Sequence, residues 1–262
     1  MKVTRFLRLT MAATIFVSSA AIGAYGADKD AEKAAKKIVR TAQKNERKVT
    51  RNKCSLGKEP VKVVCIGNSL TFHGRYDKIG WKSAHGMAAS KPEFDYCHML
   101  EKMLREINPE SSLTSRNAGR WELDFYHNSP EDVLEDACEG KDIVVIRLGE
   151  NVPGTAVPDL EEKLGEFISY CQKGAKRVVI SGMFWTDDAK EQAIRNCAKK
   201  YGITYIPINW IWELHQDTCL PKEGDTLYDT DGNPYQIEGR IYITHPNDAG
   251  MEKIATSIFN SL

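Results

Sequence analysis

The sequence predicts an α/β protein in which five parallel strands form one sheet with helices on both faces. The first observation is the order of the segments. Short apolar runs alternate with amphipathic stretches of helical length, and strands that alternate with helices pair in parallel. The second observation is that most of the apolar runs are continuous, which is typical of strands buried on both faces. The chain of 262 residues is long enough for one such domain and a terminal extension.

The strands are expected where an apolar run stops at a glycine or a polar residue. They are residues 61–67, 111–119, 142–149, 177–184 and 203–209, and the second is more polar than the others. Helices are expected at residues 93–108, 131–138, 159–173 and 189–202, and a last one begins near Asn247. Six apolar side chains share one face of the first helix: Tyr96, Met99, Leu100, Met103, Leu104 and Ile107.

Residues 1–26 have the pattern of a secretory signal peptide. Lys2, Arg5 and Arg8 precede a short apolar stretch, and small residues follow where a signal peptidase cuts. The pattern predicts an exported protein, periplasmic or secreted, that has no stable membrane insertion after cleavage. An uncleaved N-terminal anchor is the alternative, although the apolar stretch is short for a membrane-spanning helix.

Charge separates the next segment from the rest of the chain. Residues 27–53 carry a net charge of +6, and residues 54–262 carry −9. We expect residues 27–58, rich in alanine and lysine, to form a solvated helix or a flexible tail, with contact to an anionic membrane surface as an alternative. The folded domain is expected at residues 59–262. Its negative charge argues against a nucleic acid as partner.

The cysteines indicate neither a metal site nor a redox motif. No Cys-x-x-Cys pair and no metal-binding spacing occurs among the seven. They are Cys54, Cys65, Cys97, Cys138, Cys171, Cys197 and Cys219. Their odd number and apolar surroundings predict mostly buried thiols, with one or two disulfides as an alternative. No metal or organic cofactor is expected.

Three predicted strands end in a glycine and a polar residue, at residues 67–69, 117–119 and 149–151. Ligands of parallel sheets bind at the carboxyl ends of the strands. Because three such ends meet at one edge of the sheet, we expect a functional site there.

Ser69 is the candidate nucleophile at this edge. A strand-turn-helix would place its hydroxyl at an exposed tip, near the positive end of the following helix. The alternative is a serine that only caps that helix. The turn is not the Gly-x-Ser-x-Gly elbow of α/β-hydrolases, because Thr71 stands at the second glycine position.

His245 is the candidate base, because it lies in a loop just before the last helix, where Pro246 and Asn247 mark the helix start. A histidine that merely packs is the alternative. His73, four residues from Ser69, is expected to line the site. The backbone N–H of Ser69, the backbone N–H of Gly119 and the side-chain amide of Asn151 are candidate donors to an oxyanion. A turn glycine and a helix cap are the alternative roles of the last two.

Four blocks of the sequence resemble those of the SGNH hydrolases, also called the GDSL esterase/lipase superfamily. They are IGNSLT at 66–71, NAGR at 117–120, RLGENV at 147–152 and THPNDAG at 244–250, in the family order. The resemblance covers about residues 60–262 and implies a three-layer α/β/α, flavodoxin-like fold. It also implies ester hydrolysis through an acyl-serine, with Ser69, Gly119 and Asn151 as oxyanion donors and His245 as base.

Two positions depart from the pattern of that family. The first block usually reads Gly-Asp-Ser but has Asn68 here, and the last usually reads Asp-x-x-His but has Tyr242 at the aspartate position. Tyrosine cannot stabilise an imidazolium as a carboxylate does. The interpretation is a Ser–His dyad in which a backbone carbonyl holds His245, or an atypical triad in which another acid serves. The candidate acids are Glu150, Asp229, Asp231 and Asp248.

Exported proteins of this family commonly remove acetyl groups from carbohydrates, so the resemblance favours a glycan ester as substrate. Aromatic and polar side chains of the expected site loops suit sugar rings: Phe72, His73, Tyr76, Trp81, Trp121 and Trp185. The alternative is that the aromatic residues belong to the core. A lysophospholipase or thioesterase is the second candidate function. A catalytically lapsed carbohydrate-binding protein on the same scaffold is the third, because a fold alone does not determine a function.

Overall fold

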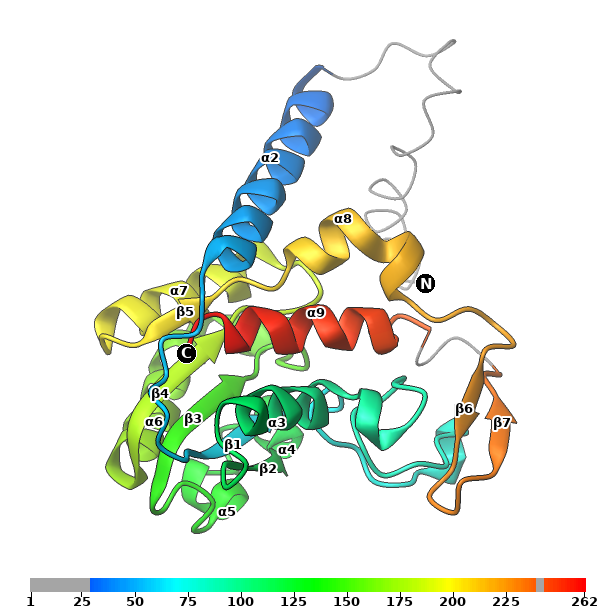
Figure 1. Ribbon diagram of the computed structural model, residues 1–262. Coiled ribbons are helices and arrows are strands. Elements are labelled where there is room, and N and C mark those ends of the chain that lie inside the picture. Colours follow the sequence, from blue (N-terminus) through cyan, green and yellow to red (C-terminus); the bar gives the residue numbers. More distant parts are fainter. Residues whose placement is uncertain (1–28, 239–242) are drawn as a thin grey trace. The chain divides into compact units, whose positions relative to one another are not determined.

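The computed structural model describes residues 29–238 and 243–262 of the chain (Figure 1). The predicted signal peptide, residues 1–26, and Tyr242 lie outside the described residues. The chain divides into two compact units, Met1–Thr41 and Ala42–Leu262. The second unit contains the sheet and every residue of the candidate site that the structure describes.

Five parallel strands form the sheet, and this prediction is confirmed. They are β1 (Lys62–Gly67), β2 (Ser112–Asn117), β3 (Lys141–Arg147), β4 (Ala175–Ser181) and β5 (Thr204–Ile206). Their order, β2-β1-β3-β4-β5, is that of flavodoxin-like folds. Gly67 pairs with Asn117 of β2 and with Arg147 of β3. The carboxyl ends of these three strands therefore lie side by side.

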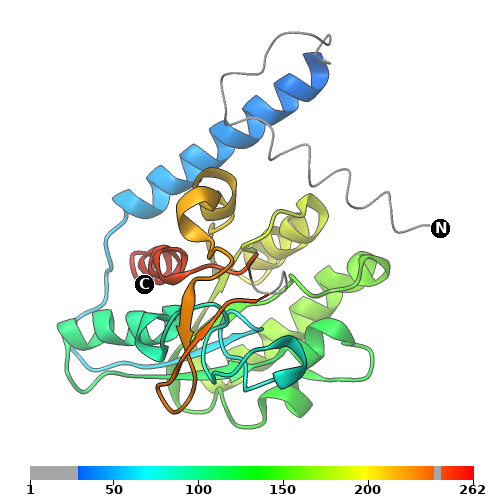
Figure 2. The same cartoon turned by 90° about the vertical axis from the view of Figure 1, so that its right-hand side faces the viewer.

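Helices cover both faces of the sheet. Along β1, Val63 and Cys65 pack toward one face, and Val64 and Ile66 pack toward the other, because successive strand residues point to opposite sides. Figure 2 shows α3 and α9 on one side of the sheet and α6 on the other. The predicted three-layer α/β/α arrangement is thus confirmed.

The helices of this unit differ in part from the predicted ones. They are α3 (Tyr96–Ile107), α4 (Gly119–Leu123), α5 (Pro130–Leu134), α6 (Leu160–Gly174), α7 (Asp188–Lys200), α8 (Trp210–Cys219) and α9 (Asp248–Phe259). The sequence reasoning missed α4 and α8. It also missed the small antiparallel pair β6 (Thr226–Tyr228) and β7 (Pro234–Gln236). Helix α5 is shorter than expected, because Glu135 at its end has a φ of 52° and cannot continue the helix.

The fifth strand is also shorter than residues 203–209. It ends at Ile206, and the next residue, Pro207, has no backbone N–H to donate to a neighbouring strand. The apolar residues beyond it still lie inside, because Ile208 is fully buried. Apolar composition therefore predicted the burial here correctly, but it overestimated the length of the strand.

Helix α2 (Lys29–Arg51) begins in the first unit and ends in the second. Most of the described side chains of α2 are exposed, but within the second unit Ala42 and Val49 are buried in the same core as α3 and α9. Within the first unit, Ile38 and Val39 are exposed. None of the helices in the described part of the chain combines the length and the hydropathy that a membrane span requires.

The cysteines agree with the expectation of buried thiols. All seven lie within the described residues, six of them are buried, and Cys54 is half-buried. The structure forms no disulfide among the seven, so their contribution here is the packing of small apolar side chains.

Candidate active site

The turn after β1 brings Ser69 to the carboxyl edge of the sheet. The carbonyl of Asn68 accepts hydrogen bonds from the N–H groups of Thr71 and Phe72, at 2.9 and 3.0 Å, so the chain turns sharply as soon as the strand ends. A Cβ on Gly67 would lie 2.0 Å from Thr71 Oγ1 and 2.8 Å from the carbonyl oxygen of Arg147. Only glycine fits this close approach of two backbones.

Ser69 lies within hydrogen-bond distance of His245. The distance from Ser69 Oγ to His245 Nε2 is 3.0 Å, although 176 residues separate the two in the sequence. A hydroxyl at this distance from an imidazole nitrogen can pass its proton to that nitrogen. The candidate nucleophile and the candidate base are therefore brought together.

A helix cap, hydrogen bonds and an aromatic ring contact the loop of residues 243–247, which we call the histidine loop. Asn247 caps α9 by accepting a hydrogen bond from the N–H of Gly250, at 3.1 Å, and its amide donates to the carbonyl of Leu220, also at 3.1 Å. The ring of Trp185 meets the His245 ring at a steep angle, with 5.1 Å between centroids. Trp185 Nε1 also donates to the carbonyl of Thr244 at 2.9 Å. These contacts restrict the position of the imidazole.

Gly119 and Asn151 lie at the same edge but bond to groups of the protein. The N–H of Gly119 donates to Asn117 Oδ1 at 2.8 Å, and Asn151 Nδ2 donates to Glu122 Oε2 at 2.7 Å. A Cβ on Gly119 would lie 3.9 Å from the Cα of Asn68, so this glycine adjoins the turn that carries Ser69. The single N–H of Gly119 would have to leave Asn117 Oδ1 before it could bind an oxyanion, whereas the amide of Asn151 has a second N–H to donate.

Behind the turn lies a set of buried polar side chains that we call the charged network: Asn68, Glu122, Arg147 and Glu150. Asn68 Nδ2 donates to Glu150 Oε2 at 2.8 Å and to Glu122 Oε1 at 3.2 Å. Asn68 Oδ1 accepts from Arg147 Nη2 at 2.9 Å. Arg147 also pairs with Glu150 at 2.6 Å, and the side chains of both are almost completely buried. Asn68 therefore bridges strands β1 and β3 behind the nucleophile.

Glu122 is a site residue that sequence reasoning missed. It is fully buried, and its Oε1 accepts a hydrogen bond from the N–H of Gly149 at 2.5 Å in addition to its contact with Asn68. Burial, with a further contribution from the negative charge of Glu150, raises the pKa of Glu122 to about 7. The signal in the sequence was an acidic residue directly after Trp121, in a short segment between a predicted strand and a predicted helix.

The acids considered as a third catalytic group have other partners. Glu150 pairs with Arg147 and accepts from the N–H of Phe184. Asp248, in the first turn of α9, accepts from the N–H and the hydroxyl of Ser90, both at 2.6 Å. Asp229 accepts from the N–H groups of Asp231 and Asn233 and so closes the turn between β6 and β7. These contacts give Glu150, Asp229 and Asp248 structural roles, and the dyad and the atypical triad remain predictions.

Two of the four predicted substrate-binding residues do not line an open site. Trp81 and Trp121 are fully buried, so the expectation that they contact a substrate is wrong. Trp121 packs against Phe125 and Phe167, and Trp81 belongs to a separate apolar cluster. The sequence could not distinguish these positions, because a tryptophan beside a polar block suits a core as well as a binding surface.

Trp185 and His73 are half-buried and accessible in part. Trp185 adjoins His245, and the main chain of His73 pairs with that of His85 in an isolated bridge. Phe72 is half-buried and Tyr76 is exposed. In residues 29–238 and 243–262, no group of three or more His, Cys, Asp or Glu side chains is placed to hold a metal ion.

Comparisons with known proteins find similarity among solved structures. No protein-family model and no curated protein matches the chain. It is similar to LAE5, an alpha/beta hydrolase from the metagenome of Lake Arreo, Spain, with 18% identity and a TM-score of 0.49 over 77% of this chain and 95% of that one. It is also similar to the acetyl xylan esterase AlAXEase, with 16% identity and a TM-score of 0.49 over 77% of this chain and 100% of that one. For a variant of the acetyl xylan esterase Axe2 from Geobacillus stearothermophilus, the identity is 15% and the TM-score 0.46, over 76% and 94% of the two chains.

Proposed function

We propose that the protein is a serine esterase of the SGNH type that hydrolyses O-acyl esters of carbohydrates, with O-acetyl groups as the favoured substrate. The observation that carries the proposal is the 3.0 Å distance between Ser69 Oγ and His245 Nε2. It joins the first and last of the four sequence blocks, which are far apart in the chain. The second and third blocks contribute to the same edge of the sheet.

In the proposed reaction, His245 Nε2 takes the proton of the Ser69 hydroxyl as Oγ attacks the acyl carbon. The negative charge on the carbonyl oxygen of the tetrahedral intermediate is stabilised by the N–H of Ser69, the N–H of Gly119 and the amide of Asn151. The imidazolium then gives its proton to the leaving sugar oxygen, which leaves an acyl-serine. Water, activated by His245, hydrolyses this ester and regenerates the serine.

The carbohydrate part of the proposal is supported by the side chains that surround the serine. Phe72 follows it in the same turn, Trp185 packs beside its base, and both are only half-buried. Flat aromatic faces combined with polar groups suit a ligand that has both ring C–H surfaces and hydroxyls. Export of the protein, proposed from residues 1–26, fits a substrate outside the cytoplasm.

The test is acetate release by the full chain from a panel of O-acetylated oligosaccharides, together with labelling by a fluorophosphonate probe. We expect release of acetate and a label on Ser69, and we expect both to disappear in Ser69→Ala. His127→Ala is the matched surface control, because the side chain of His127 is 81% exposed, and it should retain activity.

The other outcomes separate the alternatives. A labelled Ser69 without acetate release would indicate a different ester, for example that of a lysophospholipid or a thioester. A properly folded protein that neither reacts with the probe nor releases acetate would contradict the esterase. Oligosaccharide binding without turnover would then identify a carbohydrate-binding protein on this scaffold.

A further inference from the structure

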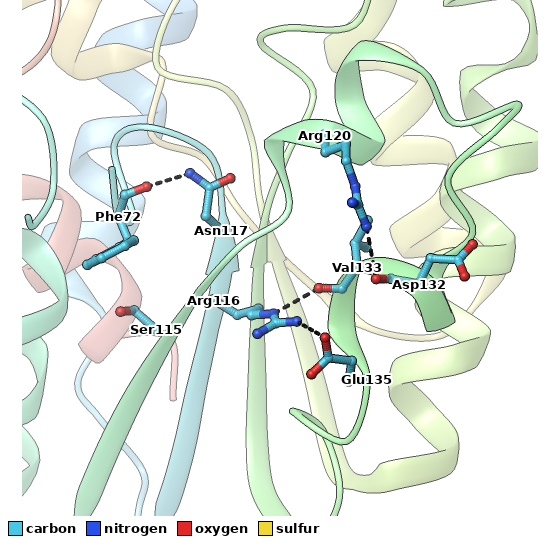
Figure 3. Close-up of a pocket in the computed structure, with 8 residues that line it drawn as sticks. All are labelled: Phe72, Ser115, Arg116, Asn117, Arg120, Asp132, Val133 and Glu135. Carbon is cyan, nitrogen blue, oxygen red and sulfur yellow. Dashed lines mark hydrogen bonds and ion pairs between the residues drawn. The ribbon is translucent and has the colours of Figure 1, made fainter. Parts of the chain in front are cut away.

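A pocket of about 400 Å³ lies along the edge strand β2, with Phe72 of the turn after β1 among its lining residues (Figure 3). Strand β2 contributes Ser115, Arg116 and Asn117, and Arg120 and Val133 come from the two short helices that follow, α4 and α5. Because β2 is the edge strand of the sheet, the pocket is not closed by a further strand.

The pocket and the active site share parts of the same turn. Phe72, which lines the pocket, is bonded through its N–H to Asn68, next to the nucleophile. Its carbonyl accepts a hydrogen bond from Asn117 Nδ2 at 2.6 Å, and Asn117 Oδ1 in turn accepts from the N–H of Gly119. Arg120 is the residue that follows Gly119. The pocket lining is therefore connected by hydrogen bonds to the turn that carries Ser69.

Two guanidinium groups face the pocket, and their positive charge is only partly balanced. Arg120 Nη2 donates to the backbone carbonyl of Asp132 at 3.0 Å. The carboxylate of Asp132 points away from this guanidinium (Figure 3) and accepts from the N–H and the hydroxyl of Ser129, at 2.9 and 2.6 Å. Among the described residues, no carboxylate lies within ion-pair distance of Arg120. Most of its five donors remain available to a ligand.

The second guanidinium, that of Arg116, has only a weak ion pair, with Glu135. Arg116 Nη2 pairs with Glu135 Oε1 at 3.0 Å, and the Glu135 side chain is 69% exposed. Exposed pairs of this kind contribute about 1 kcal/mol or less, so an incoming anion can displace Glu135. The other bond of Arg116, from Nε to the carbonyl of Val133 at 2.8 Å, holds the guanidinium in place while its outer nitrogens change partner.

We propose that this pocket is a subsite for a carboxylate of the substrate, such as that of a hexuronic acid unit in an O-acetylated glycan. The proposal rests on the proposed esterase function and makes its substrate more specific. The planar donor fork of arginine matches the two oxygens of a carboxylate. Asp132 and Glu135 also line the pocket, but the carboxylate of Asp132 is bonded to Ser129 and the side chain of Glu135 is largely exposed.

The test compares an O-acetylated oligogalacturonide with the same oligosaccharide after its carboxyl groups have been reduced to alcohols. We expect kcat/KM to be higher for the acidic form. The acidic-to-neutral ratio should fall roughly tenfold in Arg120→Gln. In Glu135→Gln, which frees Arg116, the ratio should rise. Arg105→Gln, an exposed arginine on α3, is the matched control and should leave the ratio at its original value.

Binding provides a readout that does not depend on catalysis. Titration calorimetry with Ser69→Ala should show tighter binding of the acidic oligosaccharide, and added Arg120→Gln should remove that preference. Equal affinity for the two oligosaccharides, or a preference that Arg120→Gln and Glu135→Gln both leave unchanged, would overturn the subsite. If the proposed esterase function is wrong, the result is different: Ser69 stays unlabelled and neither oligosaccharide is hydrolysed. The calorimetric result then still decides whether the pocket binds a carboxylate.

Discussion

The two sides of the candidate active site are built from different interactions. Behind Ser69 lies the charged network, in which an arginine and two glutamates are removed from solvent. Behind His245 lies the histidine loop, held by a helix cap, backbone carbonyls and an aromatic ring. The contribution of a buried charge to stability depends on the neighbouring charges and on pH, whereas that of a neutral hydrogen bond or a ring contact depends on them far less. Substitutions on the two sides should therefore affect stability, activity and pH dependence differently.

The largest effect is expected on the histidine side, and on activity. Removal of the imidazole in His245→Ala takes away the proton acceptor of Ser69, so kcat for acetate release should fall roughly 100- to 10,000-fold. The melting temperature should change far less than kcat, because Asn247 still anchors the loop through its cap of α9 and its bond to Leu220. Activity close to wild type would mean that Ser69 uses a different base.

The next effect is expected in the charged network, and on stability. Arg147→Met leaves Glu150 buried without its partner and next to Glu122, which typically costs about 3–5 kcal/mol. Urea unfolding at pH 7.5 measures this loss. The control is Arg75→Met, which removes an exposed ion pair with Asp77 and should cost about 1 kcal/mol or less. Equal losses for the two variants would show that the network adds no more than a surface pair.

The charged network should also make stability depend on pH through Glu122. Its pKa is about 7 in the folded protein, against an ordinary value of 4.5. Below pH 4.5 the carboxyl is protonated in both states, and its favourable contribution is fully present. Between pH 4.5 and 7 the unfolded chain releases the proton before the folded one does, so this contribution is lost as the pH rises. The loss should be on the order of 3 kcal/mol.

Glu122→Gln isolates this contribution, because glutamine is neutral at every pH. We expect the free energy of unfolding of the variant, relative to wild type, to rise between pH 4.5 and 8. A constant offset from altered hydrogen bonds to Asn151 and Gly149 does not affect the slope. Chemical denaturation at several pH values gives the difference directly. Parallel curves would mean that folding does not shift the pKa of Glu122.

The smallest effect is expected from the aromatic contact beside the base. Trp185→Leu loses both the edge contact with His245 and the hydrogen bond to Thr244, and kcat should fall about tenfold, as aromatic pairs contribute about 0.5–1.5 kcal/mol. Trp185→Phe keeps a ring and should retain more activity than the leucine variant. The pH dependence of stability should be that of wild type in both, since no charge is changed. A changed pH dependence would connect the histidine loop with the charged network.

Much of the fold followed from local patterns of residues. The apolar runs that form β1, β3 and β4 and the spacing along α3 could be found because side chains alternate across strands and repeat around helices. The helix α8 was missed even though Trp210 and Ile211 are buried in its first turn. It follows a strand that seemed to continue to residue 209, so an overlong strand concealed the start of a helix.

The site was predictable to the extent that it lies at strand ends. Ser69, Gly119 and Asn151 lie at the carboxyl ends of predicted strands, and topology alone brings the ends of parallel neighbours together. Glu122 could not be recognised in this way, because its carboxylate is bonded to Asn68 and Gly149, which follow β1 and β3 and are distant in the sequence. The role of Glu122 depends on the residues that surround it in the fold and not on its being a glutamate.

The sequence by itself determined the five parallel strands, the edge at which they end in polar residues, and the order of the four blocks along the chain. These features depend on periodicity and on turn-forming residues, which act over a few positions. Only the tertiary structure decided that Ser69 lies 3.0 Å from His245, that Trp81 and Trp121 belong to the core, and that Glu122 joins a buried network of charges. Each of these depends on which distant side chains exclude water from a group, and burial of that kind is a property of the assembled fold.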